Sequence, residues 1–177
     1  MTTNLENRQQ LANDSTLMGR VLRTYKSHCR YLKCATLLPE GDLAASEYLG
    51  SEASFGIPES CYIDDTGHFN SVEFNICYNQ LMYYTIAKAV KEGASRFFQC
   101  WTLDIFWAKQ LPDILIVDFK SKFKSPINPR AFHGAMEFTK AFHGPDFVHL
   151  TTHCRFWDDA SGFSEGAVNL AIVKAPK

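Results

Sequence analysis

Hydrophobic side chains dominate the stretch from residue 71 to residue 93, which reads SVEFNICYNQLMYYTIAKAVKEG. Its first seventeen residues contain one charged side chain, Glu73, and no proline or glycine. A helix that is apolar on nearly every side must be buried. Asn70 and Glu73 have the spacing of a capping box, and lysines precede Gly93 at the other end. The pattern predicts one long buried helix that begins at residue 71 and ends before Gly93.

Strand-like alternation follows this helix. Residues 114–124 alternate with a period of two, so that Leu115, Val117 and Phe119 share an apolar face and the opposite face ends in lysines. We expect a strand with one face in water or at a sheet edge. Three more extended segments follow, each after a short polar turn, at residues 131–144, 147–157 and 163–174.

Shorter elements are predicted before and after the buried helix. Residues 31–38 and 44–50 are extended segments that flank a Pro-Glu-Gly turn, which indicates a hairpin. A segment of about residues 5–25 has the apolar spacing of a helix that lies against a larger body. Residues 103–111 favour a short helix or turn that Pro112 ends.

This order of elements predicts an α+β fold in a single domain of residues 1–177. The chain has no alternation of strands and helices and no glycine-rich phosphate loop. One apolar helix and a run of curved antiparallel strands fit together when the sheet wraps around the helix, which is the hotdog fold. Because hotdog chains usually pair and form the active site between two copies, we expect at least a homodimer.

Composition narrows the possible functions. The 177 residues include 18 Lys and Arg against 19 Asp and Glu, and this balance gives no general attraction for nucleic acids or anionic membranes. No local basic patch is predicted either. The first twenty residues have no signal-peptide core, and no apolar run is long enough to span a membrane, so we expect a cytoplasmic protein. The six cysteines lack zinc spacing and are expected to be reduced and mostly buried.

Candidate chemistry concentrates in residues 61–79, at the start of the buried helix. Free N–H groups at a helix start stabilise the oxyanion or enolate that forms when a thioester is attacked. His68 is a candidate base because histidine exchanges protons near neutral pH. Glu73 is a second candidate, although capping alone would also explain it.

Several polar side chains leave two interpretations open. Asn75, Asn79 and Tyr83 recur every four residues and therefore share one helix face. Asn79 either hydrogen-bonds a thioester carbonyl or a water, or it satisfies the backbone of a strand. Tyr62 either donates its phenolic proton to a ligand or packs as an ordinary aromatic side chain.

Metal and serine-hydrolase sites are not predicted. His149 and His153 share a strand face but lack a third ligand and an acidic partner. Ser164 has no G-x-S-x-G surroundings. Cys77 is expected in the core.

Two sequence runs resemble a known family. The run YIDDTGHFNSVE at 62–73, continued by CYNQL at 77–81, resembles the FcoT-like thioesterases, which are hotdog proteins, and CRYL at 29–32 and SPINP at 125–129 fit as well. The resemblance implies an acyl thioester substrate on acyl carrier protein or coenzyme A, with phosphopantetheine as its carrier and no other cofactor. Members of this family also add glycine to (2E)-enoyl thioesters on acyl carrier protein, in pathways to isonitrile lipopeptides and β-amino acids.

The resemblance also implies a set of site residues. A base would take a proton from the glycine amine before the nitrogen attacks the β-carbon, and donors would hold the enolate oxygen. The glycine carboxylate needs a cation, for which Arg30 and Lys122 are candidates, although Lys122 stands where a family member carries arginine. The residues carried over by motif are Tyr25, Tyr62, Asn70 and Asn79, with His68 and Glu73 beside them.

Two alternatives use the same residues. Water could replace glycine and attack the thioester carbonyl, which would make the protein an acyl thioester hydrolase. The protein could instead bind acyl groups without catalysis, if backbone pairing consumed its polar side chains.

Overall fold

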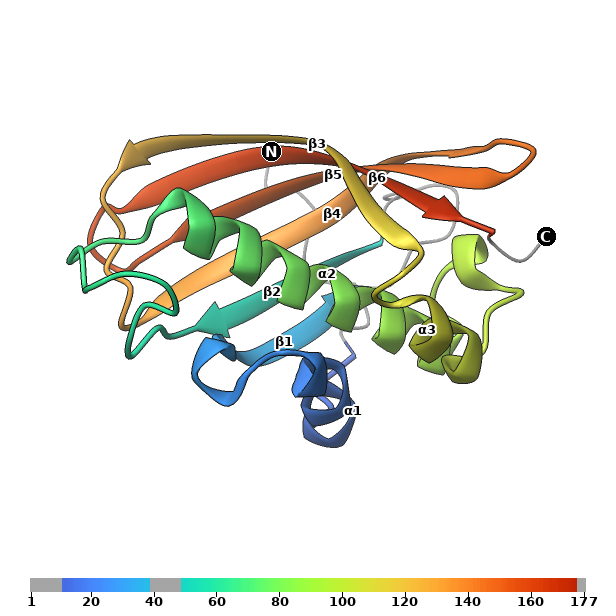
Figure 1. Ribbon diagram of the computed structural model, residues 1–177, viewed down its shortest axis with the longest axis horizontal. Coiled ribbons are helices and arrows are strands. Elements are labelled where there is room, and N and C mark those ends of the chain that lie inside the picture. Colours follow the sequence, from blue (N-terminus) through green and yellow to red (C-terminus); the bar gives the residue numbers. More distant parts are fainter. Residues whose placement is uncertain (1–10, 39–48, 175–177) are drawn as a thin grey trace, which may run out of the picture.

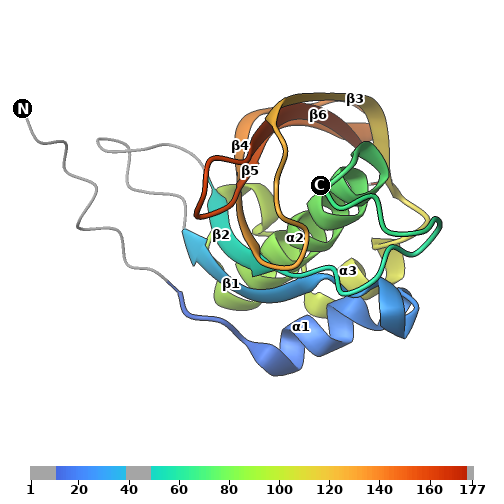
Figure 2. The ribbon, with the colours of Figure 1, turned by 90° about the vertical axis from the view of Figure 1, so that its left-hand side faces the viewer.

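The computed structural model describes residues 11–38 and 49–174. In this part of the chain, a six-stranded antiparallel sheet curves around the long helix α2 (Ser71–Glu92), as Figures 1 and 2 show. The strands follow the order β1-β2-β4-β5-β6-β3. This arrangement is the predicted α+β hotdog fold. The strands are β1 (Leu32–Leu38), β2 (Gly50–Phe55), β3 (Ile114–Ser125), β4 (Phe132–His143), β5 (Phe147–Trp157) and β6 (Phe163–Val173).

Helix α2 has the predicted bounds and caps. The Asn70 Oδ1 atom accepts hydrogen bonds from the backbone N–H groups of Val72 and Glu73, while a carboxylate oxygen of Glu73 accepts one from the Asn70 N–H. Gly93 ends the helix in the left-handed conformation, at φ 61°. The buried side chains face the sheet on one side and the short helices on the other. The same helix is therefore both the core of the fold and the support of the site at its start.

An aromatic cluster anchors the first turn of α2 to the sheet. The rings of Phe69 and Phe132 lie 4.7 Å apart, and those of Phe74 and Phe156 lie 4.8 Å apart. Gly134 leaves room for this cluster, because a Cβ atom there would lie 2.7 Å from the Phe156 ring. The loop before α2 is therefore fixed at its inner end.

Strand β3 lies at an edge of the sheet, as its lysines indicated. Ile116 and Asp118 pair with consecutive residues of β6, which leaves Val117 in a bulge. Phe119 consequently faces α2, whereas Leu115 and Val117 are 42% and 55% exposed. The prediction that these three residues share one apolar face is wrong, because the bulge shifts the alternation by one residue.

The N-terminal helix is shorter than predicted. Helix α1 (Ser15–Val21) begins where the Asp14 carboxylate accepts a hydrogen bond from the Leu17 N–H, and 3-10 turns follow at Leu22–Thr24 and Ser27–Cys29. Leu11 forms a β-bridge with Leu37 instead of a helical turn, and the predicted residues before it lie outside the described part. Helix α1 lies against α2 (Figure 1).

The remaining elements agree in part with the predictions. Strands β1 and β2 pair as an antiparallel hairpin, but β2 begins at Gly50, and most of the segment predicted as the second strand lies outside the described residues. The segment predicted as a short helix or a turn is a helix, α3 (Leu103–Lys109), and a 3-10 turn at Arg96–Phe98 precedes it.

All six cysteines are free, but only Cys77 and Cys154 are buried, so the prediction of mostly buried thiols is wrong. Across residues 11–38 and 49–174, every helix is too short or too polar to cross a bilayer.

Candidate functional site

Asn70 is the centre of a hydrogen-bond group at the start of α2. Its Oδ1 atom accepts a bond from the Tyr62 hydroxyl at 3.1 Å, in addition to the two capping bonds. Its Nδ2 atom is buried and has no hydrogen-bond partner among the described residues. A buried donor without a partner costs free energy, so this amide is suited to bind an acceptor oxygen of a ligand. The structure thus brings Tyr62 and Asn70 together.

Glu73 lies just inside this group and is 3% exposed. Its carboxylate accepts a hydrogen bond of 3.2 Å from the Asn70 backbone N–H, which confirms the capping role. Burial raises the pKa of the Cys77 thiol, and the nearby negative charge of Glu73 raises it further. Glu73 is therefore a carboxylate held in the interior, shielded from water.

His68 lies two residues before Asn70, in the exposed loop that precedes α2. Its Nδ1 atom is 3.0 Å from the Thr66 carbonyl oxygen. His68 and Asn70 line an open depression of about 380 Å³ together with the end of β3, including Phe123. The two candidate bases thus differ in surroundings, because His68 is in contact with water and Glu73 is not.

Tyr25 approaches α2 about three turns further along. Burial raises the pKa of its hydroxyl, and the neighbouring Tyr83 and Cys77 raise it further. Burial also raises the pKa of Tyr83. Both phenols therefore stay protonated at neutral pH and can donate a hydrogen bond.

Asn79 lies one turn before Tyr83 on the same face of α2. Its Nδ2 atom donates to the Oδ1 atom of Asn75 at 2.7 Å. The partner of Asn79 is thus another helix side chain, whereas the sequence left open a strand backbone or a ligand. The Oδ1 atom of Asn79 and the Nδ2 atom of Asn75 are the groups that this pairing does not use.

Gln80 holds the chain next to the candidate site, a role that the sequence analysis did not identify. It is fully buried, and its Oε1 atom accepts bonds of 2.9 Å from the backbone N–H groups of Tyr31 and Leu32. Its Nε2 atom donates to the Cys29 carbonyl at 2.6 Å. These three bonds hold the chain after Tyr25 against α2. A single glutamine inside an apolar helix was the available signal, because a buried amide needs partners.

The two candidate cations lie in different places. The Nε atom of Arg30 donates to the Tyr25 carbonyl at 3.1 Å, so Arg30 is next to the site. Lys122 projects from the outer face of the sheet, since the alternate residues Phe119 and Phe123 contact Phe74 on the inner face. Within one chain the structure therefore does not bring Lys122 to the start of α2.

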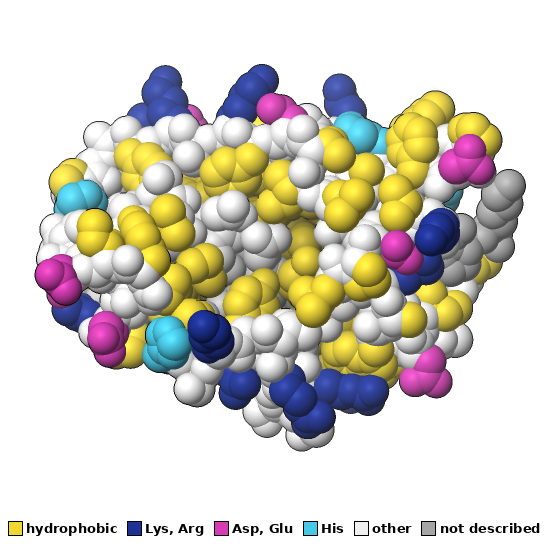
Figure 3. All heavy atoms as spheres, viewed as in Figure 1, with side chains coloured by type: hydrophobic (Ala, Val, Ile, Leu, Met, Phe, Trp, Pro, Cys, Tyr) yellow, Lys and Arg dark blue, Asp and Glu magenta, His cyan; other side chains and the backbone are white. Residues whose placement is uncertain are grey.

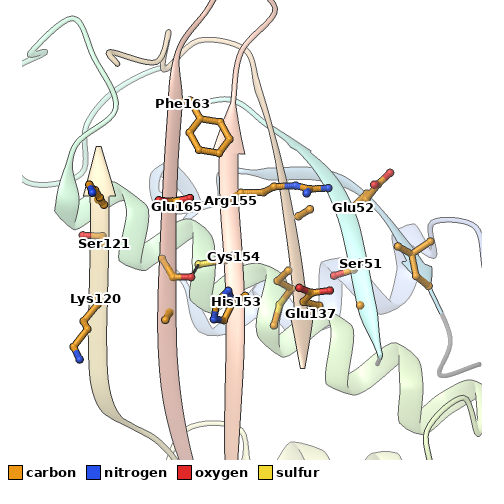
Figure 4. A pocket seen from close by; sticks show the side chains of 17 residues that line it. Ser51, Glu52, Lys120, Ser121, Glu137, His153, Cys154, Arg155, Phe163 and Glu165 are labelled. Atoms are coloured by element: carbon orange, nitrogen blue, oxygen red, sulfur yellow. Dashed lines mark hydrogen bonds between the residues drawn. The ribbon is translucent and has the colours of Figure 1, made fainter. Parts of the chain in front are cut away.

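Lys122 lines a groove on the outer face instead. This groove has a volume of about 590 Å³, and Figure 4 shows it with Arg155 and Glu165 in front of the strands and α2 behind them. His149 and His153 lie on the same outer face of β5, in alternation with its buried residues. In the described part of the chain, no three His, Cys, Asp or Glu side chains gather as they would around a metal ion.

Comparisons with known proteins identify the family. The model of the FcoT-like thioesterase domain matches residues 20–172. A (2E)-enoyl-[ACP] glycyltransferase of Streptomyces coeruleorubidus is 51% identical over 168 residues, which cover 92% of this chain and 99% of the relative. A protein of the same name from Mycobacterium marinum is 34% identical over 164 residues, which cover 90% of this chain and 86% of the relative.

Solved structures agree on the fold. A candidate thioesterase from Syntrophus aciditrophicus superposes with a TM-score of 0.53 at 9% identity, over 90% of this chain and 95% of that one. At such low identity the likeness concerns the fold alone. The match to residues 20–172 and the 51% identity concern the family, and they show that this chain belongs to the FcoT-like thioesterase family.

Proposed function

We propose that the protein is a (2E)-enoyl-[ACP] glycyltransferase. It adds the amino group of glycine to the β-carbon of an α,β-unsaturated acyl thioester on acyl carrier protein, and the product is an N-(carboxymethyl)-3-aminoacyl thioester. The observation that carries this proposal is the 51% identity to a relative of that name across 99% of its length. The unpaired Asn70 amide at the start of the buried helix supports it, because a neutral donor suits a thioester oxygen.

The reaction places distinct demands on the site. The neutral glycine nitrogen forms a bond to the β-carbon, and the electron pair of the double bond moves to the thioester oxygen as an enolate. In the proposed mechanism, the Nδ2 atom of Asn70 stabilises this oxygen. The α-carbon then takes up a proton, and the carbonyl forms again.

A base must first take a proton from the glycine ammonium group, because only the neutral amine is a nucleophile. We favour Glu73 for this step, since its carboxylate is next to Asn70 and shielded from water. The proton that it takes balances the proton that the α-carbon later receives. His68, which is exposed, remains the second candidate.

Arg30 is the proposed partner of the glycine carboxylate. It contacts the backbone of Tyr25 through Nε, and this leaves the terminal nitrogens of its guanidinium group for a carboxylate. The position of Lys122 on the outer face makes it a poorer candidate within one chain.

We also propose that the protein forms a homodimer or a larger oligomer. β3 is an edge strand of twelve residues with exposed Leu115 and Val117, which suits pairing with a second copy in at least a homodimer. A sedimentation experiment at micromolar concentration tests this. Carrier-bound substrates and a cytoplasmic location remain predictions, as does phosphopantetheine as the only carrier group.

One assay tests the function. The protein is incubated with a (2E)-enoyl pantetheine thioester, with and without isotopically labelled glycine, and the products are followed by mass spectrometry. We expect a labelled adduct that requires both protein and glycine. Free acid that forms regardless of glycine would show a thioester hydrolase, and bound but unchanged thioester would show an acyl-binding protein.

A further inference from the structure

We propose that residues 20–33, which we call the basic segment, form the docking surface for the acidic face of the carrier protein that delivers the acyl thioester. This inference rests on the proposed function. It concerns how the substrate reaches the site, and it rests on the exposed cations of the segment other than Arg30, whose proposed partner is the glycine carboxylate.

Positive charge is concentrated in the basic segment. It contains five of the 18 Lys and Arg residues of the chain, and His28 in addition. No Asp or Glu occurs between Asp14 and Glu40. The net charge of −1 for the whole chain conceals this excess, so the prediction that no local basic patch exists is wrong. The cations are Arg20, Arg23, Lys26, Arg30 and Lys33.

These charges are exposed and not neutralised nearby. Arg23, Lys26 and Lys33 are exposed, and none of the five cations forms an ion pair with a carboxylate among the described residues. Two of the β3 lysines differ, because Lys124 pairs with Glu165 at 3.0 Å and Lys120 lies 3.8 Å from Asp118. The field of the basic segment is thus available to a partner.

The basic segment is rigid enough to define a surface. Val21 and Leu22 are buried in the core, and Arg20 stacks over the Trp107 ring at 4.2 Å. At the other end, Gln80 fixes the backbone from Cys29 onward through its three hydrogen bonds. Little ordering is therefore required when a partner binds.

The basic segment also lies beside the site. Tyr25 is part of it and reaches Tyr83 on α2. Figure 1 shows the segment between α1 and β1, below α2, and Figure 3 shows Lys and Arg side chains along the lower margin of this face, below a broad area of hydrophobic side chains. A carrier protein seated there could pass its phosphopantetheine arm over Tyr25 to the start of α2.

The chemistry of the segment favours an acidic protein over other anions. Its two aromatic residues, Tyr25 and Tyr31, are half-buried and buried, so they offer no surface on which nucleic-acid bases could stack. Its hydrophobic residues also face the core, which leaves no apolar face to insert into a membrane. Exposed cations on a segment whose own hydrophobic side chains face the core suit electrostatic steering of a protein partner.

A pair of charge reversals tests the docking surface. The variant Arg23→Glu with Lys26→Glu alters two exposed cations that form no hydrogen bond or ion pair with the site donors among the described residues. The matched control is Lys120→Glu with Lys140→Glu, two exposed lysines on the sheet. Each protein is assayed with the same (2E)-enoyl chain on a type II acyl carrier protein and on free pantetheine.

We expect the Arg23 and Lys26 variant to lose about tenfold in kcat/KM on the carrier substrate, mostly through KM, and to keep wild-type activity on the pantetheine substrate. The control should change neither value by more than about twofold. The wild-type rate on the carrier should fall as salt is raised, and this dependence should be weaker in the variant.

Three results would overturn the docking surface: equal activity of wild type on the two substrates, an equal loss by the variant on both, or an equal loss by the control on the carrier. Titration of the unacylated holo-carrier separates this inference from the proposed function, since it measures docking without glycine addition. Binding of the wild type but not the variant to anionic vesicles, with no difference on the carrier, would assign the segment to a lipid surface.

Discussion

The two faces of the sheet carry different kinds of polar group. On the side of α2, the groups around the site are mainly neutral donors, such as Asn70 and Tyr25, among aromatic rings. On the outer face, charge alternates between neighbouring strands, where Lys122, Glu165 and Arg155 stand in register. Exposed charges of this kind are screened by water and contribute little. Neutral donors in a drier environment interact more strongly with an oxygen that gains charge during a reaction.

This difference supports the proposal that the chemistry takes place on the inner side. The outer groove is larger, at about 590 Å³ against about 380 Å³, but its charged side chains are of both signs and exposed to water. Size alone is therefore a poor guide to the site in this molecule. Substitutions on the two faces should have very different effects on activity, and the following predictions measure that contrast.

The largest effect is expected from Glu73→Gln. Glutamine keeps the capping box, so the helix should stay intact, whereas the base is removed. We expect kcat to fall by about 10²- to 10⁴-fold, the range for loss of a general base, with little change in the thermal midpoint. His68→Ala is the comparison and should lose less. A fully active Glu73→Gln protein beside an inactive His68→Ala protein would transfer the role to His68.

Asn70→Ser should have the next largest effect. Serine caps a helix about as well as asparagine, but it lacks the buried Nδ2 donor. We expect a loss of about 10²-fold in kcat, as when one donor to an oxyanion is removed, and nearly unchanged stability in urea. Activity close to that of the wild type would mean that Asn70 serves only as a cap.

A smaller effect, on the free energy of unfolding, is expected from a substitution of Asp158, which joins two turns next to the candidate site. The carboxylate of Asp158 accepts hydrogen bonds from four backbone N–H groups, one in the turn at Asn128 and the others at residues 160–162. These bonds lower the pKa of Asp158. The neighbouring carbonyl of Ile127 accepts from the Phe69 N–H, which links this turn to the start of α2.

We therefore expect Asp158→Ala to lower the free energy of unfolding by about 1 kcal/mol at neutral pH, since the side chain is partly exposed. Because the pKa is lower in the folded protein, this stabilisation is present above the unfolded pKa of about 4 and disappears as the pH falls through the folded value. Urea titrations from pH 7 to pH 3 measure it. A difference between variant and wild type that stays constant with pH would contradict the ionic origin.

The sequence predicted some of these features well because their causes are local. Asn70, Glu73 and Gly93 mark the ends of α2 through contacts within a few residues, and they were identified without a fold. The alternation placed Lys122 on the wet face, where the structure has it, but the exposure of Leu115 and Val117 depends on pairing with β6 and on the bulge at Val117, of which the alternation contains no sign. Which side chains of β3 are exposed was therefore determined by its pairing with β6, which the local sequence pattern could not predict.

The same distinction applies to the site. Tyr62 and Asn70 are eight residues apart, and their hydrogen bond follows from the loop and cap that the motif indicated. Tyr25 lies near Tyr83 on α2 in a part of the chain that Gln80 holds to α2, through hydrogen bonds across about fifty residues. The resemblance to a family supplied Tyr25, whereas its physical reason needed the structure.

The smallest effect should come from Lys122→Met on the outer face. Its ammonium group is exposed and directed away from α2, so we expect kcat and the KM for glycine to stay within about twofold of the wild type. Arg30→Met, next to Tyr25, should instead raise the KM for glycine about tenfold, because it removes a charge-assisted bond to the carboxylate. Both are measured on the pantetheine substrate, which avoids any effect on carrier docking. If Lys122→Met alone raised the KM for glycine, the outer face would belong to a site completed by a second copy, and the contrast between the two faces would hold only within one chain.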